Sequence, residues 1–390
     1  MTSHGPTITG APDSDVRWVD SARDLAELVR LLLDEPAYGL DTEFLSERTY
    51  WPRLCLVQVS WPRGVALVDP FTCDVRALAD VLRAPATMIT FAGASDLPIL
   101  ERAVGARPSG LFDVQLAAGF VGLGLPSLGS LVSTLLGTHL DKSEQLADWS
   151  ARPITPAIRT YAAADVAYLF PLASELSRRL QAVGREAWAA SDCEQLRLTP
   201  EKRIDANTAW WKIKGAGSMR GEKAGVAQAV AAWRERRAQR LDVPPRSVLP
   251  DLALAAVVSR PPRTRDDVFA LRGVTRMTPE VARELLAAVD AGRSMLPSDL
   301  RLPDRVDDGS ELDAAVSFLV AYVAELAHTE RIEKQLVATR EDVKALVYGR
   351  PSRLDEGWRA ALAGDWLRRL LAGDAVIRLV DGGRHIRLED

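Results

Sequence analysis

Residues 38–60 read YGLDTEFLSERTYWPRLCLVQVS, and this stretch decides the fold of the first half of the chain. An apolar entry leads into Asp41-Thr42-Glu43, and a second apolar run follows at 54–59 after a polar interval. The pattern predicts two strands of one hairpin. Because successive side chains of a strand point to opposite faces, Asp41 and Glu43 share one face. Two neighbouring carboxylates repel each other, and a divalent cation is the usual compensation.

The composition is that of a soluble chain with room for two or three domains. It has 390 residues, of which 47% are hydrophobic and 26% charged, and its net charge is -4. It lacks a charge-free apolar run of roughly 18 residues, so we expect no membrane span. Residues 1–14 have neither the basic nor the apolar region of a signal peptide, and we expect them to be disordered. Three scattered cysteines fit a reducing compartment, which predicts a cytoplasmic protein.

The charge is unevenly distributed along the chain. Residues 201–300 contain 18 Lys and Arg against 12 Asp and Glu, a net charge of +6, so the acidity lies elsewhere. A polyanionic partner is therefore compatible with the acidic total. Arg-rich helices can also be merely solvated, and charge alone leaves both interpretations open.

Outward from the hairpin, the N-terminal half alternates strands and helices. Apolar spacing predicts a helix that begins after Ser21 and a third long strand at 64–68. The elements predicted beyond it are a helix at 75–82, a strand at 87–92, a helix at 97–104 and a strand at 111–113. Three consecutive antiparallel strands followed by this alternation predict an α/β layered domain with a mixed sheet. Chemistry in such sheets collects at the carboxyl ends of strands, where Asp41, Glu43 and Asp113 lie.

The second half of the sequence is mainly helical. A helix predicted at 155–180 places Tyr161 and Asp165 on one face, because positions i and i+4 stack. A composition shift near 205–217 marks a domain boundary, where Trp210 and Trp211 are expected to seat the linker on a neighbouring domain. Further helices are predicted at 128–136, at 225–240, from 252, 265 and 279, and at 311–326, 331–347 and 355–371. The tail alternates around Asp381-Gly382, which predicts a hairpin.

The acidic residues carry different weight as catalytic candidates. Asp-x-Glu on a strand is weak evidence alone, because such triplets also occur on solvated edges. Asp96 opens a helix after a buried strand, where a structural N-cap is the simpler interpretation. Asp165 lies in an apolar helix, where an unpaired carboxylate is costly and calls for a cation or an arginine.

Five motifs carry a resemblance to a known family. DTEF, AGASDLPIL, FDVQLAA, LDKSEQLADWS and YAAADVAYLFPL follow one another as in ribonuclease D. The chain closely resembles this family, which belongs to an exonuclease superfamily named for four acids and a tyrosine. The residues that match the invariant set are Asp41, Glu43, Asp96, Tyr161 and Asp165. The resemblance runs from about residue 17 to the C-terminus and is looser over the last 90 residues.

The resemblance implies a domain order. An RNase H-like exonuclease domain with a mixed β-sheet is expected at 15–205, followed by a linker at 206–215. Two all-helical modules similar to helicase-and-RNase-D C-terminal (HRDC) domains are expected at 216–298 and 299–390.

The resemblance also implies a metal site. Four hard oxygen donors suit Mg²⁺ or Mn²⁺, and none of the four histidines is near enough in the motifs to suggest zinc. By the family's pattern, Asp41 bridges two divalent cations about 4 Å apart. Glu43 and Asp165 hold the nucleophile-side ion, Asp96 holds the other largely through water, and Tyr161 orients the attacking water.

Two positions near the motifs lie outside the family's invariant set. Asp113 is therefore interpreted as structural. Phe91 stands where the family often has histidine, and because that position is not a metal ligand, little effect on the chemistry is expected.

Other residues are candidates for contacts with substrate. Lys142 is expected to contact a phosphate, with pairing to Glu144 as the alternative. Arg48, Tyr50 and Trp51 lie in the loop beside the site, where they can stack terminal bases or simply pack the loop. The helix predicted at 225–240 is strongly basic, and four of its arginines are candidates for phosphate contacts or for solvation: Arg234, Arg236, Arg237 and Arg240.

Together these features predict a metal-dependent 3′-5′ exoribonuclease that releases 5′-nucleotides one at a time. The expected substrates are structured RNAs such as tRNA precursors with 3′ extensions, held by the helical modules without an obligate protein partner. One alternative is an exonuclease acting on DNA 3′ ends, since proofreading and helicase-associated enzymes share these residues. Another is a non-catalytic RNA-binding protein, which the complete set of acids disfavours. The helical modules alone could instead dock a protein.

Overall fold

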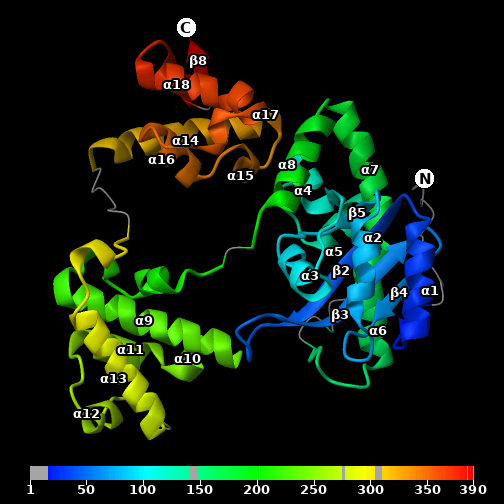
Figure 1. Ribbon diagram of the computed structural model, residues 1–390. Coiled ribbons are helices and arrows are strands. Elements are labelled where there is room, and N and C mark those ends of the chain that lie inside the picture. The colour runs from blue at the N-terminus through cyan, green and yellow to red at the C-terminus, as the bar shows by residue number, and fades with distance from the viewer. Residues whose placement is uncertain are drawn as a thin grey trace. The chain divides into compact units, whose positions relative to one another are not determined.

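The computed structural model describes residues 16–389 apart from 141–143, 145–146, 202, 275–276, 304–309 and 384. The described residues divide into two units (Figure 1). The first comprises the described residues up to Glu43, Leu54–Pro200, and those from Ser310 onward. The second comprises Phe44–Arg53 and the described residues of Glu201–Gly309.

A six-stranded mixed sheet forms the centre of the first unit, in the order β1-β4-β3-β2-β5-β6. β3 and β4 pair antiparallel, whereas the pairs β1-β4, β2-β5 and β5-β6 are parallel. The strands are β1 (Val16–Val19), β2 (Ala37–Leu45), β3 (Arg53–Trp61), β4 (Gly64–Val68), β5 (Thr87–Thr90) and β6 (Gly110–Asp113). The predicted hairpin is the neighbouring pair β2 and β3, and the predicted mixed sheet is confirmed.

Helices cover this sheet, and their ends follow local sequence signals. Ser21 caps α1 (Ala22–Leu33) by accepting a hydrogen bond from the Asp24 amide, as the pattern predicts. The helices that follow are α2 (Ala79–Arg83), α3 (Asp96–Val104), α4 (Val114–Phe120), α5 (Leu128–Leu136), α6 (Pro156–Ala167), α7 (Leu169–Ala182) and α8 (Glu186–Leu198), with a 3₁₀ turn at Val75–Leu78.

The predicted single helix at 155–180 is wrong, because the chain breaks at Tyr168 between α6 and α7. Pro171 gives the physical reason. In a continuous helix its ring would clash with the Ala167 carbonyl and it could not donate to that group. Near the start of a new helix the missing N–H costs little, so α7 begins at Leu169.

The C-terminal segment of the first unit shares its hydrophobic core. Val114, Leu131 and Leu169 belong to one buried cluster with Val316 and Trp358. The elements are α14 (Ser310–Glu330), α15 (Lys334–Val337), α16 (Arg340–Val347), α17 (Gly357–Arg359), a π turn at Ala360–Gly364, α18 (Asp365–Ala372), and the strands β7 (Val376–Val380) and β8 (His385–Glu389). The predicted terminal hairpin is confirmed by antiparallel pairing of β7 with β8.

The predicted helix at 331–347 is divided. Ala338 takes an extended conformation after α15, and Thr339 caps α16 in a capping box with Asp342. Thr339 therefore starts a new helix where the periodic pattern predicts continuation.

α14 is long and apolar enough, by composition, to cross a membrane at Leu312–Glu330. However, Val316, Leu319 and Val323 are buried in the shared core. We therefore interpret α14 as a core helix.

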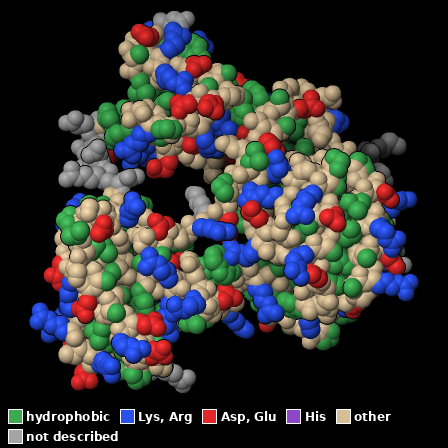
Figure 2. Space-filling view, viewed as in Figure 1, with side chains coloured by type: hydrophobic (Ala, Val, Ile, Leu, Met, Phe, Trp, Pro, Cys, Tyr) green, Lys and Arg blue, Asp and Glu red, His purple; other side chains and the backbone are tan. Residues whose placement is uncertain are grey.

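The second unit is helical around α9 (Gly221–Leu241) and α13 (Pro279–Arg293), with the shorter helices α10 (Pro245–Val248), α11 (Asp251–Ser259) and α12 (Arg265–Phe269). A Cβ on Gly225 would lie 2.2 Å from the Gly292 carbonyl oxygen, so glycine permits the close approach of α9 and α13. Trp210 is fully buried in this unit's core, and its indole N–H donates to the Arg301 carbonyl. On the face shown in Figure 2, basic and acidic side chains are interspersed.

Candidate functional site

Carboxylates from three elements converge at the sheet. Asp41 and Glu43 of β2 and Asp165 of α6 present oxygens that all lie within 4.8 Å of one another. Asp96, the first residue of α3, is only 5% exposed and accepts a hydrogen bond from the Thr42 hydroxyl. Its charge also raises the pKa of Asp41. The structure therefore brings together the four acids that the sequence singles out.

Burial and mutual repulsion make this cluster reluctant to ionise. Burial, followed by the charges of Asp96, Asp165 and Glu43, raises the pKa of Asp41 well above its ordinary value. Burial raises the pKa of Glu43 to about 8 and that of Asp165 to about 7. It also raises the pKa of Asp96 to about 6, against the Thr42 hydrogen bond. A cation would offset both the desolvation and the repulsion, as expected of a metal site.

A close approach of α6 to the sheet positions Asp165. The Ser60 hydroxyl of β3 donates to the carbonyl of Val166, the next residue, at 2.9 Å. On β2, a Cβ at Gly39 would lie 2.1 Å from Ser60 Oγ and 3.1 Å from Leu169 Cδ1. The absence of a side chain at Gly39 therefore lets Ser60 fix α6 beside the strand that carries Asp41.

Tyr161 lies one turn before Asp165 on α6. Burial and the charges of Asp165, Glu43 and Asp41 raise its pKa to about 12, so the hydroxyl keeps its proton at neutral pH. Its ring lies 6.2 Å from that of Trp149, which is 5% exposed. Trp149 comes from the LADWS motif and packs beside the tyrosine, a contact that the sequence reasoning does not predict.

Gln58 is a second neighbour that the sequence reasoning misses. It is fully buried on β3, and its Nε2 lies 3.5 Å from Glu43 Oε1. Its own Oε1 has no hydrogen-bond partner among the described residues. The available signal is a lone polar residue inside the apolar run LCLVQVS.

Asp113 and Asp96 both have a structural interpretation from the sequence, and the structure agrees with it for Asp113 but not for Asp96. Asp113 is 1% exposed and accepts hydrogen bonds from the amides of Ala92, Gly93, Gln115 and Leu116, so it caps α4 and ties down the loop before α3. Asp96 is not an N-cap, because Ser95 occupies that position. Phe91 packs, half-buried, against the hydrophobic core.

Two of the residues predicted to contact substrate, Tyr50 and Trp51 of the β2–β3 loop, form hydrogen bonds with other residues of the second unit. The Tyr50 hydroxyl pairs with Glu235 and accepts from Gln239 on α9. The amides of Tyr50 and Trp51 each donate to Asp242 at 3.1 Å. Arg48 is exposed. Tyr50 and Trp51 thus hold the loop on α9. Contact of Arg48, Tyr50 and Trp51 with RNA stays a prediction. Lys142 lies outside the described residues.

The four candidate arginines of the basic helix, α9, also contact other side chains of the second unit. Arg234 pairs with Asp251 at 2.6 Å, and Arg237 pairs with Glu284 at 2.6 Å. Arg236 donates to the Asn207 side chain, and Arg240 lies 3.9 Å from Glu284. Arg234 and Arg237 are therefore paired with acids within the unit, Arg240 lies near the acid that Arg237 uses, and the partner of Arg236 is a neutral amide.

The mixed sheet and its cluster of half-buried acids are those expected of one class of protein, the 3′-5′ exonucleases. A family model described as 3′-5′ exonuclease matches residues 16–181, and the HRDC domain model matches residues 223–289. Ribonuclease D of Gluconacetobacter diazotrophicus is 35% identical over 91% of this chain and 92% of that protein. Ribonuclease D of Acidiphilium cryptum is 32% identical over 90% and 92%, respectively.

A solved structure extends the likeness to three dimensions. Escherichia coli RNase D, described as an exoribonuclease involved in structured RNA processing, aligns with a TM-score of 0.80 and 29% identity. The alignment covers 92% of this chain and 99% of that chain. The chain therefore belongs to the ribonuclease D family of 3′-5′ exoribonucleases, as the motifs predict.

Proposed function

We propose that this chain trims structured RNA, such as tRNA precursors with 3′ extensions, using two divalent cations held by Asp41, Glu43, Asp96 and Asp165. The observation that carries the proposal is the approach of Asp41, Glu43 and Asp165 oxygens to within 4.8 Å of one another. The described function of the E. coli relative supports the choice of RNA. Three buried free cysteines, Cys55, Cys73 and Cys193, support a cytoplasmic location.

The donor set fits Mg²⁺ or Mn²⁺. All candidate ligands are carboxylate oxygens, which these hard cations prefer. When bound, such ions activate water and stabilise the leaving oxygen in phosphodiester cleavage. Asp41 would hold the cations together with the other three acids, because burial and the charges of those acids raise its pKa and a bound cation would offset both effects.

The remaining side chains position the reactants. We assign Glu43, Asp165 and Tyr161 to the attacking water, as the family's pattern implies; the charges of Asp165, Glu43 and Asp41 all act on the tyrosine hydroxyl. Because the hydroxyl keeps its proton, Tyr161 can donate a hydrogen bond to the water or to a phosphate oxygen. We assign Trp149, whose ring lies 6.2 Å from that of Tyr161, to the support of the tyrosine ring.

A time course on 5′-labelled tRNA with a 3′ extension, resolved at one nucleotide, tests the proposal. With Mg²⁺ or Mn²⁺ the product should shorten one nucleotide at a time from the 3′ end, and EDTA should stop it. Internal cleavage, or trimming that persists in EDTA, would contradict the mechanism.

The same assay separates RNA from DNA as substrate. A single-stranded RNA and a DNA of identical sequence are compared at equal concentration. Faster trimming of RNA is expected, whereas faster trimming of DNA would favour the alternative that the enzyme acts on DNA 3′ ends.

A further inference from the structure

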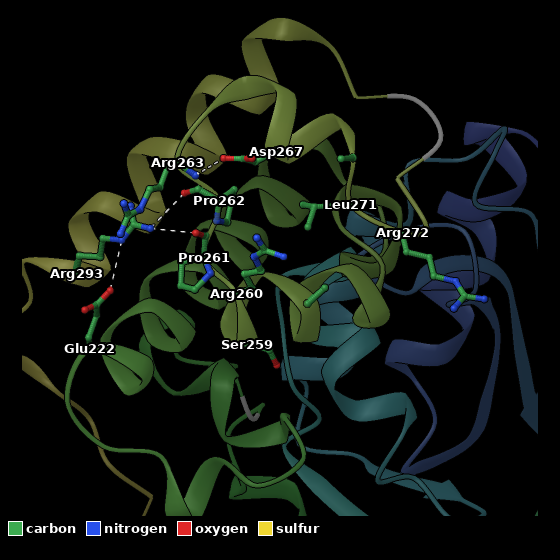
Figure 3. A pocket seen from close by; sticks show the side chains of 12 residues that line it. Glu222, Ser259, Arg260, Pro261, Pro262, Arg263, Asp267, Leu271, Arg272 and Arg293 are labelled. Atoms are coloured by element: carbon green, nitrogen blue, oxygen red, sulfur yellow. Dashed lines mark hydrogen bonds and ion pairs between the residues drawn. The ribbon is translucent and has the colours of Figure 1, made fainter.

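A hollow of about 810 Å³ opens on the second unit, lined by the end of α11, the segment that leads into and through α12, and the end of α13 (Figure 3). Its lining includes four arginines and two acids: Arg260, Arg263, Arg272, Arg293, Glu222 and Asp267. The hollow lies within the range matched by the HRDC model, apart from its outermost residues.

One arginine and both acids are already satisfied inside the protein. Arg293 contacts Glu222 at 3.5 Å and Asp290 at 3.1 Å, and it donates to the carbonyls of Pro261 and Pro262. Asp267 accepts from the backbone amides of Arg263 and Thr264, which lowers its pKa. These groups build the wall of the hollow.

Three cationic side chains remain available. Arg260, Arg263 and Arg272 are exposed, and their guanidinium groups form no hydrogen bond or ion pair with any residue that the structure describes. In Figure 3 the order across the view is Arg263, Arg260 and Arg272, and the Arg272 side chain extends away from the other two. This contrasts with Arg234 and Arg237 of α9, whose charges are paired within the unit.

We propose that this hollow binds the phosphate backbone of the RNA substrate, with Arg260, Arg263 and Arg272 contacting successive phosphates. The inference rests on the proposed function and specifies which face of the HRDC module holds the RNA body. Guanidinium groups match phosphate oxygens in a two-pronged geometry. On binding, the three arginines give up no hydrogen bond or close ion pair with the described residues, although the charge of Arg260 also acts on Asp267.

The rest of the lining suits a nucleotide chain. Pro261 and Leu271 are half-buried and offer apolar surface to sugars or bases, while Ser259 offers an exposed hydroxyl. The volume exceeds that needed by a single phosphate and lies within the range of ligand sites. Contacts of this kind are independent of base sequence, so the hollow should grip RNA without selecting its sequence.

The test uses the full chain and a triple variant, R260Q/R263Q/R272Q. Exposed side chains without partners should be replaced without loss of the fold, which thermal unfolding checks. Arg283→Gln is the matched control, since Arg283 is also exposed, lies on α13, and has no side-chain partner among the described residues. Affinity for a 3′-extended tRNA is measured in Ca²⁺ at several salt concentrations.

The triple variant should weaken tRNA binding by about tenfold or more and reduce the slope of log affinity against log salt by about two. R260K/R263K/R272K should retain most of that slope, because the charges remain. The control should stay within about twofold of the wild type. Unchanged affinity and slope in the triple variant would overturn the proposal. Tight binding of polyglutamate by the wild type, without binding of tRNA, would also overturn it.

Catalysis provides an independent readout. The triple variant should lose kcat/KM on the extended tRNA while trimming a short single-stranded oligonucleotide at the wild-type rate. Equal loss on both substrates would overturn the proposal. A wild-type chain that binds tRNA but trims neither substrate would instead defeat the proposed function while leaving the binding test valid.

Discussion

The protonation of individual carboxyls sets the behaviour of the site when no metal is bound. The pKa of Glu43 is raised to about 8 and that of Asp165 to about 7, both chiefly by burial. A folded state with raised carboxyl pKa values binds protons more tightly than the unfolded chain. The stability from this source is therefore complete below pH about 4 and is lost as pH rises through about 7 to 8.

The melting temperature of the metal-free protein should accordingly fall between pH 5 and pH 8.5 by more than that of a Glu43→Gln/Asp165→Asn variant. Added Mg²⁺ should raise the wild-type melting temperature most at the upper end of this range. Scanning calorimetry in EDTA and in Mg²⁺ measures both effects. Parallel pH profiles for the two proteins would contradict the assigned shifts.

Gln58 offers a second test at this scale. Gln58→Leu removes the amide that lies 3.5 Å from Glu43 and also removes a buried oxygen without a described partner. We expect the Mg²⁺ concentration for half-maximal trimming to rise severalfold. The free energy of unfolding should stay the same or increase. A metal titration checks this. An unchanged titration would show that Gln58 does not orient Glu43.

Between elements, the decisive contact is that of α6 with the β2–β3 pair. Gly39 leaves room for the Ser60 hydroxyl, which holds the Val166 carbonyl next to Asp165. The position of Asp165 therefore depends on Gly39 and Ser60, neither of which is a candidate metal ligand.

Gly39→Ala should destabilise the protein by about 1–3 kcal/mol, because the added methyl displaces the Ser60 hydroxyl. It should also lower kcat more than Ser60→Ala, which removes the hydrogen bond but adds no volume. Chemical denaturation and trimming rates measure the pair. If Gly39→Ala trims at the wild-type rate, the close approach does not position Asp165.

The sequence predicts some of these features and not others, for physical reasons. Asp41, Glu43, Tyr161 and Asp165 follow from strand alternation, helical spacing and motif order. The breaks at Tyr168 and Thr339 are missed because apolar periodicity continues through them. Gln58 and Trp149 are missed because their roles depend on partners distant in sequence, which local patterns do not specify.

At the scale of the whole molecule, the C-terminal segment is part of the catalytic unit. Asp192 of α8 accepts two hydrogen bonds from Arg359 at 2.9 and 2.5 Å and one from the Trp358 indole. Asp192 is 7% exposed and Arg359 is 5% exposed. The pair ties the exonuclease helices to the last helices of the chain.

Asp192→Ala should cost about 3–5 kcal/mol, because it leaves the Arg359 charge buried without its partner. Arg23→Ala, which removes an exposed ion pair with Glu27, should cost less than about 1 kcal/mol. Urea denaturation compares the two. A small effect of Asp192→Ala would mean that the C-terminal segment is coupled weakly to the catalytic unit.

The central claim is that the four clustered acids hold the cations needed to trim RNA, and replacement of Asp41 tests it most directly. Trimming of 5′-labelled, 3′-extended tRNA in Mg²⁺ is followed for the wild type, for Asp41→Asn, and for a control that alters an exposed acid, Asp74→Asn. Asp41→Asn should trim roughly a thousandfold more slowly or not at all, with RNA affinity in Ca²⁺ nearly intact. Trimming by Asp41→Asn at the rate of the control would contradict the account.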